Sequence, residues 1–301
     1  TPNYKFMLAL IIFNLPIFGL VLHSLTKARK STKNVRLKWR KINYDNASKL
    51  QTNAKLFEEL KSTNANAAMV ANNIKATTNM PIYDKSQVTY LENGIVYKNA
   101  VIKELNNAKE FILIEVSRIS DGEFWKEIFA VLKRKAIEGL DIKILYDEKQ
   151  CLKAFKEKRA FEKFINHGIT ALPFNRIKLL STTFRFSRDK RNAFIIDGLV
   201  AISGVVEICD EYVKDSHTHY KASDGIKVEG DAVWSHIVLF FSNWHLFSKK
   251  KIDVQHYNKT TPVKTKNKSF TQVYGRVPFY KENINKNILI NMLNLARKSV
   301  L

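Results

Sequence analysis

The sequence predicts a mixed α/β protein preceded by an apolar N-terminal helix. From Val88 onward, short apolar runs alternate with segments whose apolar residues recur at helical spacing. Strands that alternate with helices in this way, together with the hairpin described below, indicate a mixed, largely parallel sheet covered by helices on both faces. Ahead of this region, Phe6–Leu25 contains no charged residue, which separates it from the polar chain around it.

The apolar stretch Phe6–Leu25 is about as long as a helix needs to be to cross the hydrocarbon core of a bilayer. Pro16 and Gly19 interrupt it, and a membrane helix tolerates both residues better than a soluble helix does. A signal peptide has a shorter apolar core and small residues at a cleavage site, which His23–Thr26 does not resemble. We therefore predict a transmembrane helix within residues 1–26, with a buried core helix as the alternative.

A basic segment follows the apolar stretch and contains no acidic residue. Its cations are Lys27, Arg29, Lys30, Lys33, Arg36, Lys38, Arg40 and Lys41. A basic cluster beside a span marks the cytoplasmic side and attracts anionic lipids. We therefore expect a protein of the cell membrane whose soluble part lies on the cytoplasmic face. The formal net charge of +22 also favours anionic partners, although abundant Lys and Asn are equally typical of an AT-rich genome.

The rest of the chain divides into three further parts. Residues 27–80 are predicted to be a basic juxtamembrane segment and linker with a short helical stripe at Leu56, Phe57 and Leu60, and residues 81–248 carry the α/β alternation. The predicted strands are Val88–Leu91, Phe111–Val116, Ile142–Tyr146, Ile169–Leu172 and Gly225–Val228. The predicted helices are Val101–Ala108, Phe124–Ile137, Phe155–Asn166 and Ala232–Phe247. Residues 249–301 begin with a basic, polar linker.

Several chemistries find no support in the sequence. Cys151 and Cys209 are the two cysteines, and without a paired spacing they argue against a disulfide scaffold or a zinc knuckle and fit a reducing compartment. His217 and His219 lack a third ligand at metal spacing, and no glycine-rich phosphate loop is present. We therefore expect no metal and no organic cofactor.

A β-hairpin is predicted between Arg188 and Tyr212. Phe194–Ile196 is an apolar run, Asp197-Gly198 is a dipeptide favoured in hairpin turns, and Leu199–Ser203 is the return strand. Arg188, Lys190 and Arg191 precede it, and Asp210 and Glu211 follow it. The pattern alone is also typical of an ordinary core hairpin with a solvated rim.

This hairpin resembles the first catalytic motif of the phospholipase D superfamily, in the form found in bacterial cardiolipin synthases. That motif is His-x-Lys-x4-Asp, followed by Gly, a return strand, Gly-Gly-x-Asn and Asp-Glu-Tyr. Aligned without gaps, Lys190 stands at the His position, Asn192 at the Lys position and Asp197 at the Asp position. The further matches are Gly198, Gly204, Asp210, Glu211 and Tyr212. Val205 and Glu207 replace the second Gly and the Asn.

Shorter landmarks of the same family occur in the same order along the chain. They are Asn93-Gly94, Ile114-Glu115, Asp121-Gly122-Glu123, Glu138-Gly139, Tyr146-Asp147, Glu229-Gly230, Val233-Trp234 and Trp244. The resemblance implies a phospholipase D-like fold of two α/β halves, each of which gives one motif to a single site. Residues 105–113 recur in modified form as 293–301, so we expect the chain to end as a truncated second half begins.

The resemblance implies phosphatidyl transfer between two phosphatidylglycerols, which yields cardiolipin and glycerol without a cofactor. In the family one His becomes a phosphohistidine, the other protonates the leaving glycerol, each Lys holds phosphate oxygens, and each Asp orients its His. Lys190, as an ammonium, has no lone pair to attack with. Asn192 carries no charge, and Glu207 should repel phosphate. Asp197 is expected only to hydrogen-bond, or to pair with Lys190 or Arg191. The candidate substrate-binding residues are Arg188, Arg191, Gly204 and Glu207.

Three hypotheses follow from these substitutions. The first is a catalytically degenerate cardiolipin synthase relative that at most binds anionic phospholipid, namely phosphatidylglycerol or cardiolipin. The second is a subunit or fragment of an active synthase that completes its site with another copy, an intact homologue or a missing second half. The third is a membrane-associated nucleic-acid-binding protein, because Phe184, Arg185, Phe186 and Arg188 could stack on nucleotides. The membrane span makes nucleic acid the less expected partner.

Overall fold

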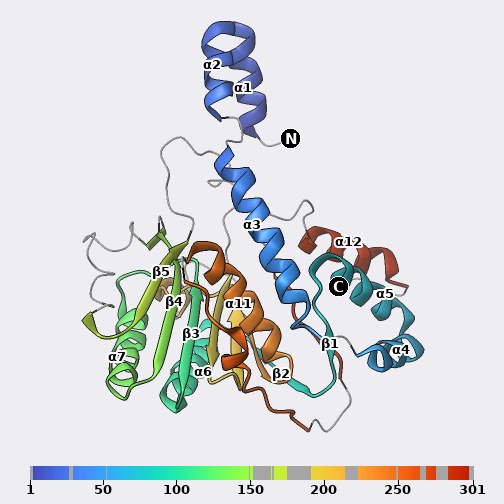
Figure 1. Cartoon of the computed structure of the whole chain (residues 1–301), viewed down its shortest axis with the longest axis vertical. Helices are drawn as coiled ribbons and strands as arrows, with labels where there is room; N and C mark the ends of the chain where they lie inside the picture. The colour runs from blue at the N-terminus through green and yellow to red at the C-terminus, as the bar shows by residue number, and fades with distance from the viewer. Residues whose placement is uncertain are drawn as a thin grey trace.

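The computed structural model describes residues 3–26, 30–51, 53–148, 150–151, 164, 166–174, 191–213, 223–248, 250–264, 269–275 and 284–297. Within these residues the body is a seven-stranded sheet in the order β2-β8-β7-β6-β3-β4-β5 (Figure 1). Its strands are β2 (Ser86–Leu91), β3 (Phe111–Val116), β4 (Asp141–Asp147), β5 (Thr170–Phe174), β6 (Asn192–Ile196), β7 (Val200–Gly204) and β8 (Gly225–Gly230). The predicted strands and the predicted hairpin are therefore confirmed.

The direction of the strands differs from the prediction. Only the β3–β4 and β4–β5 pairs among these strands are parallel, whereas β2–β8, β3–β6, β6–β7 and β7–β8 are antiparallel. The predicted mixed sheet is confirmed. The prediction that it is largely parallel was wrong, because β3–β6, β7–β8 and β2–β8 also pair antiparallel, in addition to the predicted hairpin.

Helices cover both faces of the sheet. In β3, Ile112 and Ile114 belong to the apolar core shared with α6 (Gly94–Asn107) and α7 (Glu123–Ile137). Phe111 and Leu113 belong to the core shared with α11 (Val233–Phe247) on the opposite face. All six residues of β3 are consequently buried, as expected for a central strand with two covered faces. The predicted helix Phe155–Asn166 lies largely outside the described residues.

The N-terminal apolar stretch folds as two helices, not one. α1 (Asn3–Asn14) and α2 (Pro16–Thr26) lie side by side as a hairpin that projects from the body (Figure 1). Pro16 cannot continue α1 because it has no amide hydrogen, yet it fits the first position of α2. Gly19 permits the close approach, since a Cβ there would lie 2.5 Å from the Ile12 Cα. The predicted single transmembrane helix is therefore not observed, and none of the helices described has the length and apolar character needed to span a membrane.

The predicted linker between residues 27 and 80 is mostly helical. α3 (Lys30–Ala47) packs against α11, while α4 (Ala54–Thr63) and α5 (Ala65–Thr78) pack on each other. The helical stripe at Leu56 and Leu60 forms the small core of this pair, as predicted. The chain returns to these helices after residue 249, because β9 (Thr271–Gln272) pairs with β1 (Ile82–Tyr83) and α12 (Ile284–Leu295) packs on α5.

The two copies of the sequence repeat end their helices in the same way. α6 ends at Asn107 and α12 ends at Leu295, which are aligned positions of the repeat. In α6 the Ala108 amide donates to the Leu105 carbonyl at 3.4 Å, and in α12 the Ala296 amide donates to the Leu293 carbonyl at 3.3 Å. This local similarity agrees with a duplication, while the second half itself stays a prediction.

Candidate functional site

The motif residues lie at opposite ends of β6. Asn192 begins the strand, and Asp197 follows it in the turn, where Asp197 has φ +52° and Gly198 has φ +70°. Two positive φ values in a two-residue loop favour Asp-Gly, which explains why this dipeptide was predictive. At about 3.4 Å per residue, the strand separates Asn192 from Asp197 by roughly 17 Å.

Asp197 holds the start of β3. Its carboxylate accepts hydrogen bonds from three consecutive backbone amides, those of Lys109 (2.7 Å), Glu110 (2.8 Å) and Phe111 (2.9 Å). Of the two alternatives predicted for Asp197, the structure shows hydrogen bonding. The Arg191 guanidinium lies 3.1 Å from Glu115 Oε1 at the other end of β6, and Lys190 lies outside the described residues. These contacts give Asp197 a structural role, and a role in chemistry stays a prediction.

Asn192, at the position of the family's Lys, holds the chain where β3 ends. Its Oδ1 accepts hydrogen bonds from the Ser117 amide at 2.9 Å and from the Ser117 hydroxyl at 3.0 Å. The residue is buried, with 4% of its surface exposed. Because the amide nitrogen of Ser117 can only donate, the oxygen of Asn192 must face it.

Glu207 lies beside Ser117 on the other side. The Ser117 hydroxyl is 3.2 Å from Glu207 Oε1, so its single proton is shared between this carboxylate and the Asn192 oxygen. Arg118 Nη1 lies 3.5 Å from Glu207 Oε2, and Arg118 Nη2 lies 2.6 Å from Glu211 Oε1. The carboxylates of Glu207 and Glu211 thus share the Arg118 guanidinium, just beyond the end of β3.

Arg191 is engaged on the opposite face, beneath α11. Its Nη2 lies 3.1 Å from Glu115 Oε1, and the Asn243 amide donates to the same oxygen at 2.6 Å. Glu115 is 2% exposed. Gly275 lies against the guanidinium, since a Cβ there would come within 3.0 Å of Arg191 Nη1. Arg191, predicted to bind substrate, is therefore part of a buried ion-pair network.

Three separate sequence landmarks meet at the loop after β7. The Asp210 carboxylate accepts hydrogen bonds from the amides of Glu123 (3.1 Å) and Phe124 (3.0 Å), and so caps α7 from a distant part of the chain. A Cβ on Gly122 would lie 2.5 Å from this carboxylate, and a Cβ on Gly94 would lie 1.7 Å from the Tyr212 carbonyl oxygen. The sequence analysis did not predict that Asp210 caps α7. A signal for it was present, because α7 begins after Gly122, which has no side chain with which to cap the helix.

Of the other predicted site residues, some lie outside the described part of the chain and Gly204 lies within it. Arg188, Lys190 and the aromatic-basic stretch around Phe184 lie outside the described residues. Gly204 ends β7 opposite Asn192, and a Cβ there would lie 2.6 Å from the Asp224 carbonyl oxygen, so close strand packing explains this glycine. In the described part of the chain, no three His, Cys, Asp or Glu side chains are grouped so that they could hold a metal ion.

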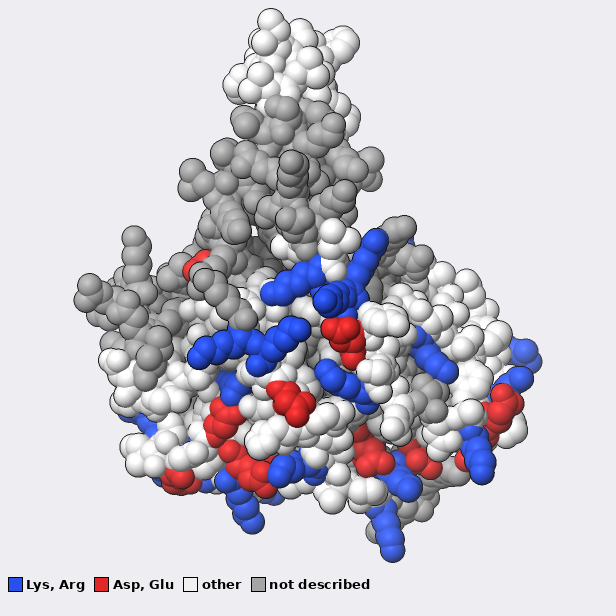
Figure 2. All heavy atoms as spheres, viewed as in Figure 1, with Lys and Arg blue, Asp and Glu red and all other residues white. Residues whose placement is uncertain are grey.

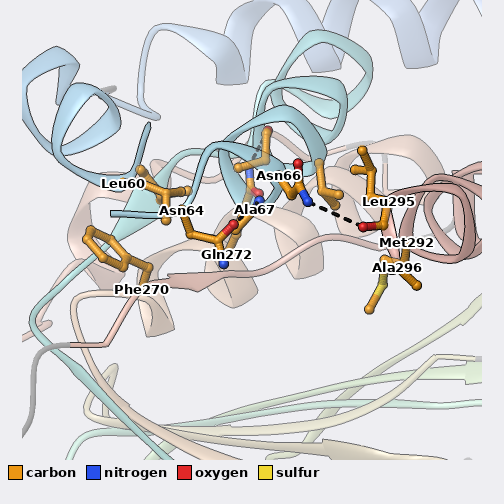
Figure 3. A pocket seen from close by; sticks show the side chains of 12 residues that line it. Leu60, Asn64, Asn66, Ala67, Phe270, Gln272, Met292, Leu295 and Ala296 are labelled. Atoms are coloured by element: carbon orange, nitrogen blue, oxygen red, sulfur yellow. Dashed lines mark hydrogen bonds between the residues drawn. The ribbon is translucent and has the colours of Figure 1, made fainter. Parts of the chain in front are cut away.

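One cavity among the described residues lies away from these side chains. It has a volume of about 460 Å³ and lies between α4, α5, β9 and α12 (Figure 3). Its lining is mainly apolar, with Leu60, Val70 and Phe270 among its residues, and Asn66 Nδ2 donates across it to the Leu295 carbonyl at 3.3 Å. None of the predicted site residues lines it.

Comparison with known sequences finds cardiolipin synthases among the relatives of this chain. A cardiolipin synthase of Listeria monocytogenes is 30% identical over 218 residues, which are 71% of this chain and 45% of that protein. A cardiolipin synthase of Alkalihalophilus pseudofirmus is 27% identical over 223 residues, 73% of this chain and 44% of that protein. The chain is a homologue of these bacterial cardiolipin synthases. No protein-family profile matches it.

The cardiolipin synthase homologue covers only part of these relatives. An uncharacterized protein of Streptococcus mutans is 26% identical over 294 residues, 97% of this chain but 63% of that protein. Among solved structures, phosphatidylserine synthase of Haemophilus influenzae has a TM-score of 0.44 at 16% identity, with 63% of this chain and 45% of that chain covered. Nuc of Salmonella typhimurium has a TM-score of 0.38 at 16% identity, with 55% and 97% covered. Scores this low carry no argument, so the family assignment rests on sequence.

Proposed function

We propose that this cardiolipin synthase homologue binds anionic phospholipid at a membrane and does not by itself transfer phosphatidyl groups. The proposal rests on one observation, the hydrogen bonds that the uncharged Asn192 makes at the position of the family's Lys. The amide there is tied to Ser117, and the Glu207 carboxylate lies on the other side of the same hydroxyl.

The substituted motif lacks the charge that phosphoryl chemistry needs. Phosphatidyl transfer places extra negative charge on the phosphate oxygens, which the family offsets with lysines and which Asn192 cannot offset. Glu207 acts in the opposite direction. A unit negative charge 4 Å from its carboxylate is disfavoured by about 4 kcal/mol at an effective dielectric of 20. A phosphodiester therefore reaches a reactive position beside Asn192 at a considerable free-energy cost.

Membrane association is proposed from the α1–α2 hairpin. Its exposed side chains are large and apolar: Phe6, Met7, Leu10, Phe13, Leu15, Ile17, Phe18, Leu20 and Val21. Exposed apolar area of this kind marks an interaction surface. In Figure 2 the tip of the hairpin carries neither basic nor acidic side chains, whereas basic side chains gather on the body beneath it. Lys38, Arg40 and Lys41 of α3, the helix that follows the hairpin, are exposed, and their positive charge favours anionic lipid headgroups.

A vesicle assay tests both parts of this proposal. We expect the purified chain to float with phosphatidylglycerol vesicles, to bind phosphatidylcholine vesicles more weakly, and to release from the anionic vesicles as salt rises. Mass spectrometry of the same samples should detect no cardiolipin and no glycerol. Product formation would contradict the non-catalytic assignment, and equal binding to both vesicle types would contradict anionic selectivity.

A second candidate function is that of a partner subunit. It is favoured by the matched helix ends of α6 and α12, which suggest that the unit duplicated in its relatives is repeated here. In that case co-expression with an intact cardiolipin synthase should raise the cellular cardiolipin content above that produced by the intact enzyme alone. An unchanged cardiolipin content, with both chains expressed, would count against this function.

A further inference from the structure

The α1–α2 hairpin is apolar on its inner and its outer side. In α1 the outward-facing Phe6 and Phe13 are exposed, and Ile12 on the inner side lies against Gly19 of α2. Between positions 6 and 21, Asn14 is the one polar side chain. A helix that lies flat on a membrane surface has a polar face that stays in water, and neither arm of the hairpin has such a face over these positions. The hairpin surface therefore suits immersion in hydrocarbon.

Each arm of the hairpin is about as long as one leaflet of a bilayer is deep. α1 has 12 residues and α2 has 11, which at about 1.5 Å per residue give lengths of roughly 18 and 17 Å. The hydrocarbon core of a bilayer is about 30 Å thick, so one leaflet contributes about 15 Å. A hairpin of this size that is inserted tip first reaches the middle of the bilayer.

The turn between the two arms bonds several of its polar groups within the hairpin. Asn14 Nδ2 donates to the Leu10 carbonyl at 2.9 Å. The Leu15 amide donates to the Ile11 carbonyl at 2.8 Å, and Pro16, the next residue, has no amide hydrogen to satisfy. Polar groups without a partner are costly in hydrocarbon, where no water can replace the missing hydrogen bond. These bonds lower the cost of placing the turn in hydrocarbon.

Polar residues are concentrated at the open end of the hairpin. Lys5 is the one formally charged residue of the two helices and lies in the first turn of α1, while His23, Ser24 and Thr26 lie in the last part of α2. α3, which carries the exposed cations that favour anionic headgroups, begins at the same end of the hairpin (Figure 1). The open end therefore suits the headgroup layer, and the tip suits the hydrocarbon beneath it.

We propose that the α1–α2 hairpin enters a single leaflet tip first and returns to the same side of the bilayer. The start of α1 and the start of α3 then both lie in the headgroup layer, on the side of the body. The inference rests on the proposed function for membrane binding, and it adds the depth and the direction of insertion. It differs from a membrane span, which places the two ends of the apolar stretch on opposite sides of the bilayer.

Chemical access to the two ends of the hairpin tests this topology. Both natural cysteines are buried, so a fluorescent nitrobenzoxadiazole label attaches selectively to a cysteine introduced at an exposed position. We would label Asn3→Cys at the start of α1, Ile17→Cys near the tip and Glu127→Cys on the body. Each full chain is added to preformed phosphatidylglycerol vesicles and then treated with dithionite, an anion that bleaches the label and does not cross the bilayer. The Glu127→Cys label defines complete access from outside.

The hairpin predicts a different rate of bleaching at each end. The Asn3→Cys label should be bleached as fast and as completely as the Glu127→Cys label. The Ile17→Cys label should be bleached at least about tenfold more slowly, because an anion is excluded from hydrocarbon. Protection of the Asn3→Cys label would overturn the inference, since a span places the start of α1 inside the vesicle. Equal bleaching of all three labels would also overturn it, since the tip would then lie outside the hydrocarbon.

A matched pair of lysine substitutions tests the direction of insertion. Asn14→Lys places a positive charge at the tip, whereas Ser24→Lys places the same charge at the open end of α2. Asn14→Lys should weaken flotation with phosphatidylglycerol vesicles at least about tenfold, because a lysine is costly near the centre of a bilayer. Ser24→Lys should leave flotation unchanged or strengthen it, because it meets anionic headgroups. Equal effects of the two lysines would contradict tip-first insertion.

Flotation separates failure of this inference from failure of the proposed function. A natural chain that does not float with the vesicles contradicts membrane binding itself. A chain that floats with a protected Asn3→Cys label, or with an Ile17→Cys label open to dithionite, binds the membrane without a hairpin in one leaflet. If the Ile17→Cys chain does not float as the natural chain does, Phe13→Cys on the other arm, where the side chain is 88% exposed, decides by the same criteria.

Discussion

Replacement of Asp197 by alanine is expected to lower the free energy of unfolding by about 3 to 5 kcal/mol. The carboxylate accepts hydrogen bonds from three consecutive amides at the start of β3, and a hydrogen bond to a charged group contributes about 1.5 to 3 kcal/mol. The total is less than the sum because the three bonds share one side chain. The midpoint of urea unfolding, followed by circular dichroism, measures the loss.

Asp197→Asn provides the matched control. Asparagine tolerates the positive φ of this turn position, and it keeps one oxygen acceptor while it loses the charge. We expect about half of the loss seen with alanine. A loss below about 1 kcal/mol for Asp197→Ala would contradict the structural role, because a peripheral hydrogen bond accounts for that much. Such a small loss would instead favour the catalytic role that the family motif implies for Asp197.

Glu115→Ala is the second change with a large expected effect. It removes the anionic partner of Arg191 and the acceptor of the Asn243 amide beneath α11. Removing one partner of a buried ion pair costs about 3 to 5 kcal/mol, because a desolvated charge is left behind. Urea unfolding should therefore show a loss of unfolding free energy as large as that of Asp197→Ala. The near-ultraviolet circular dichroism spectrum of the folded variant should match that of the natural chain.

A double change distinguishes a lost charge partner from lost packing. Glu115→Leu combined with Arg191→Leu removes both charges and should recover most of the stability lost in either single variant, because an apolar pair of similar volume can replace a buried ion pair. The exposed pair Lys98–Glu127 is the comparison, since Glu127→Ala should cost at most about 1 kcal/mol. If Glu115→Ala costs no more than Glu127→Ala, the network beneath α11 does not stabilise the sheet.

Local pattern was enough to predict most elements of the fold. Apolar runs identified the strands, helical spacing identified α7 and α11, and Asp197-Gly198 identified the hairpin turn. Each of these signals depends on a period of two or 3.6 residues or on the preferred φ of one dipeptide, and such properties reside in a few consecutive residues. The succession of short family motifs was likewise readable, and sequence comparison agreed with it.

The tertiary structure decided what distant residues do to one another. Pairing direction in the sheet depends on the path of the whole chain, so the antiparallel β3–β6 and β7–β8 pairs were missed. Pro16 and Gly19 were interpreted as residues that a membrane helix tolerates. In the structure Pro16 begins α2, and Gly19 allows α2 to approach Ile12 of α1 closely.

The same distinction applies to the site. Asp197 meets Lys109–Phe111 and Glu207 meets Ser117 across 86 to 90 positions of sequence, and neither contact leaves a periodic trace. The sequence by itself therefore determined which residues stand at the positions of the family motif. Only the folded chain determined that Asp197 holds the start of β3 and that Glu207 contacts Ser117 and Arg118, because these contacts depend on distances that the fold alone sets.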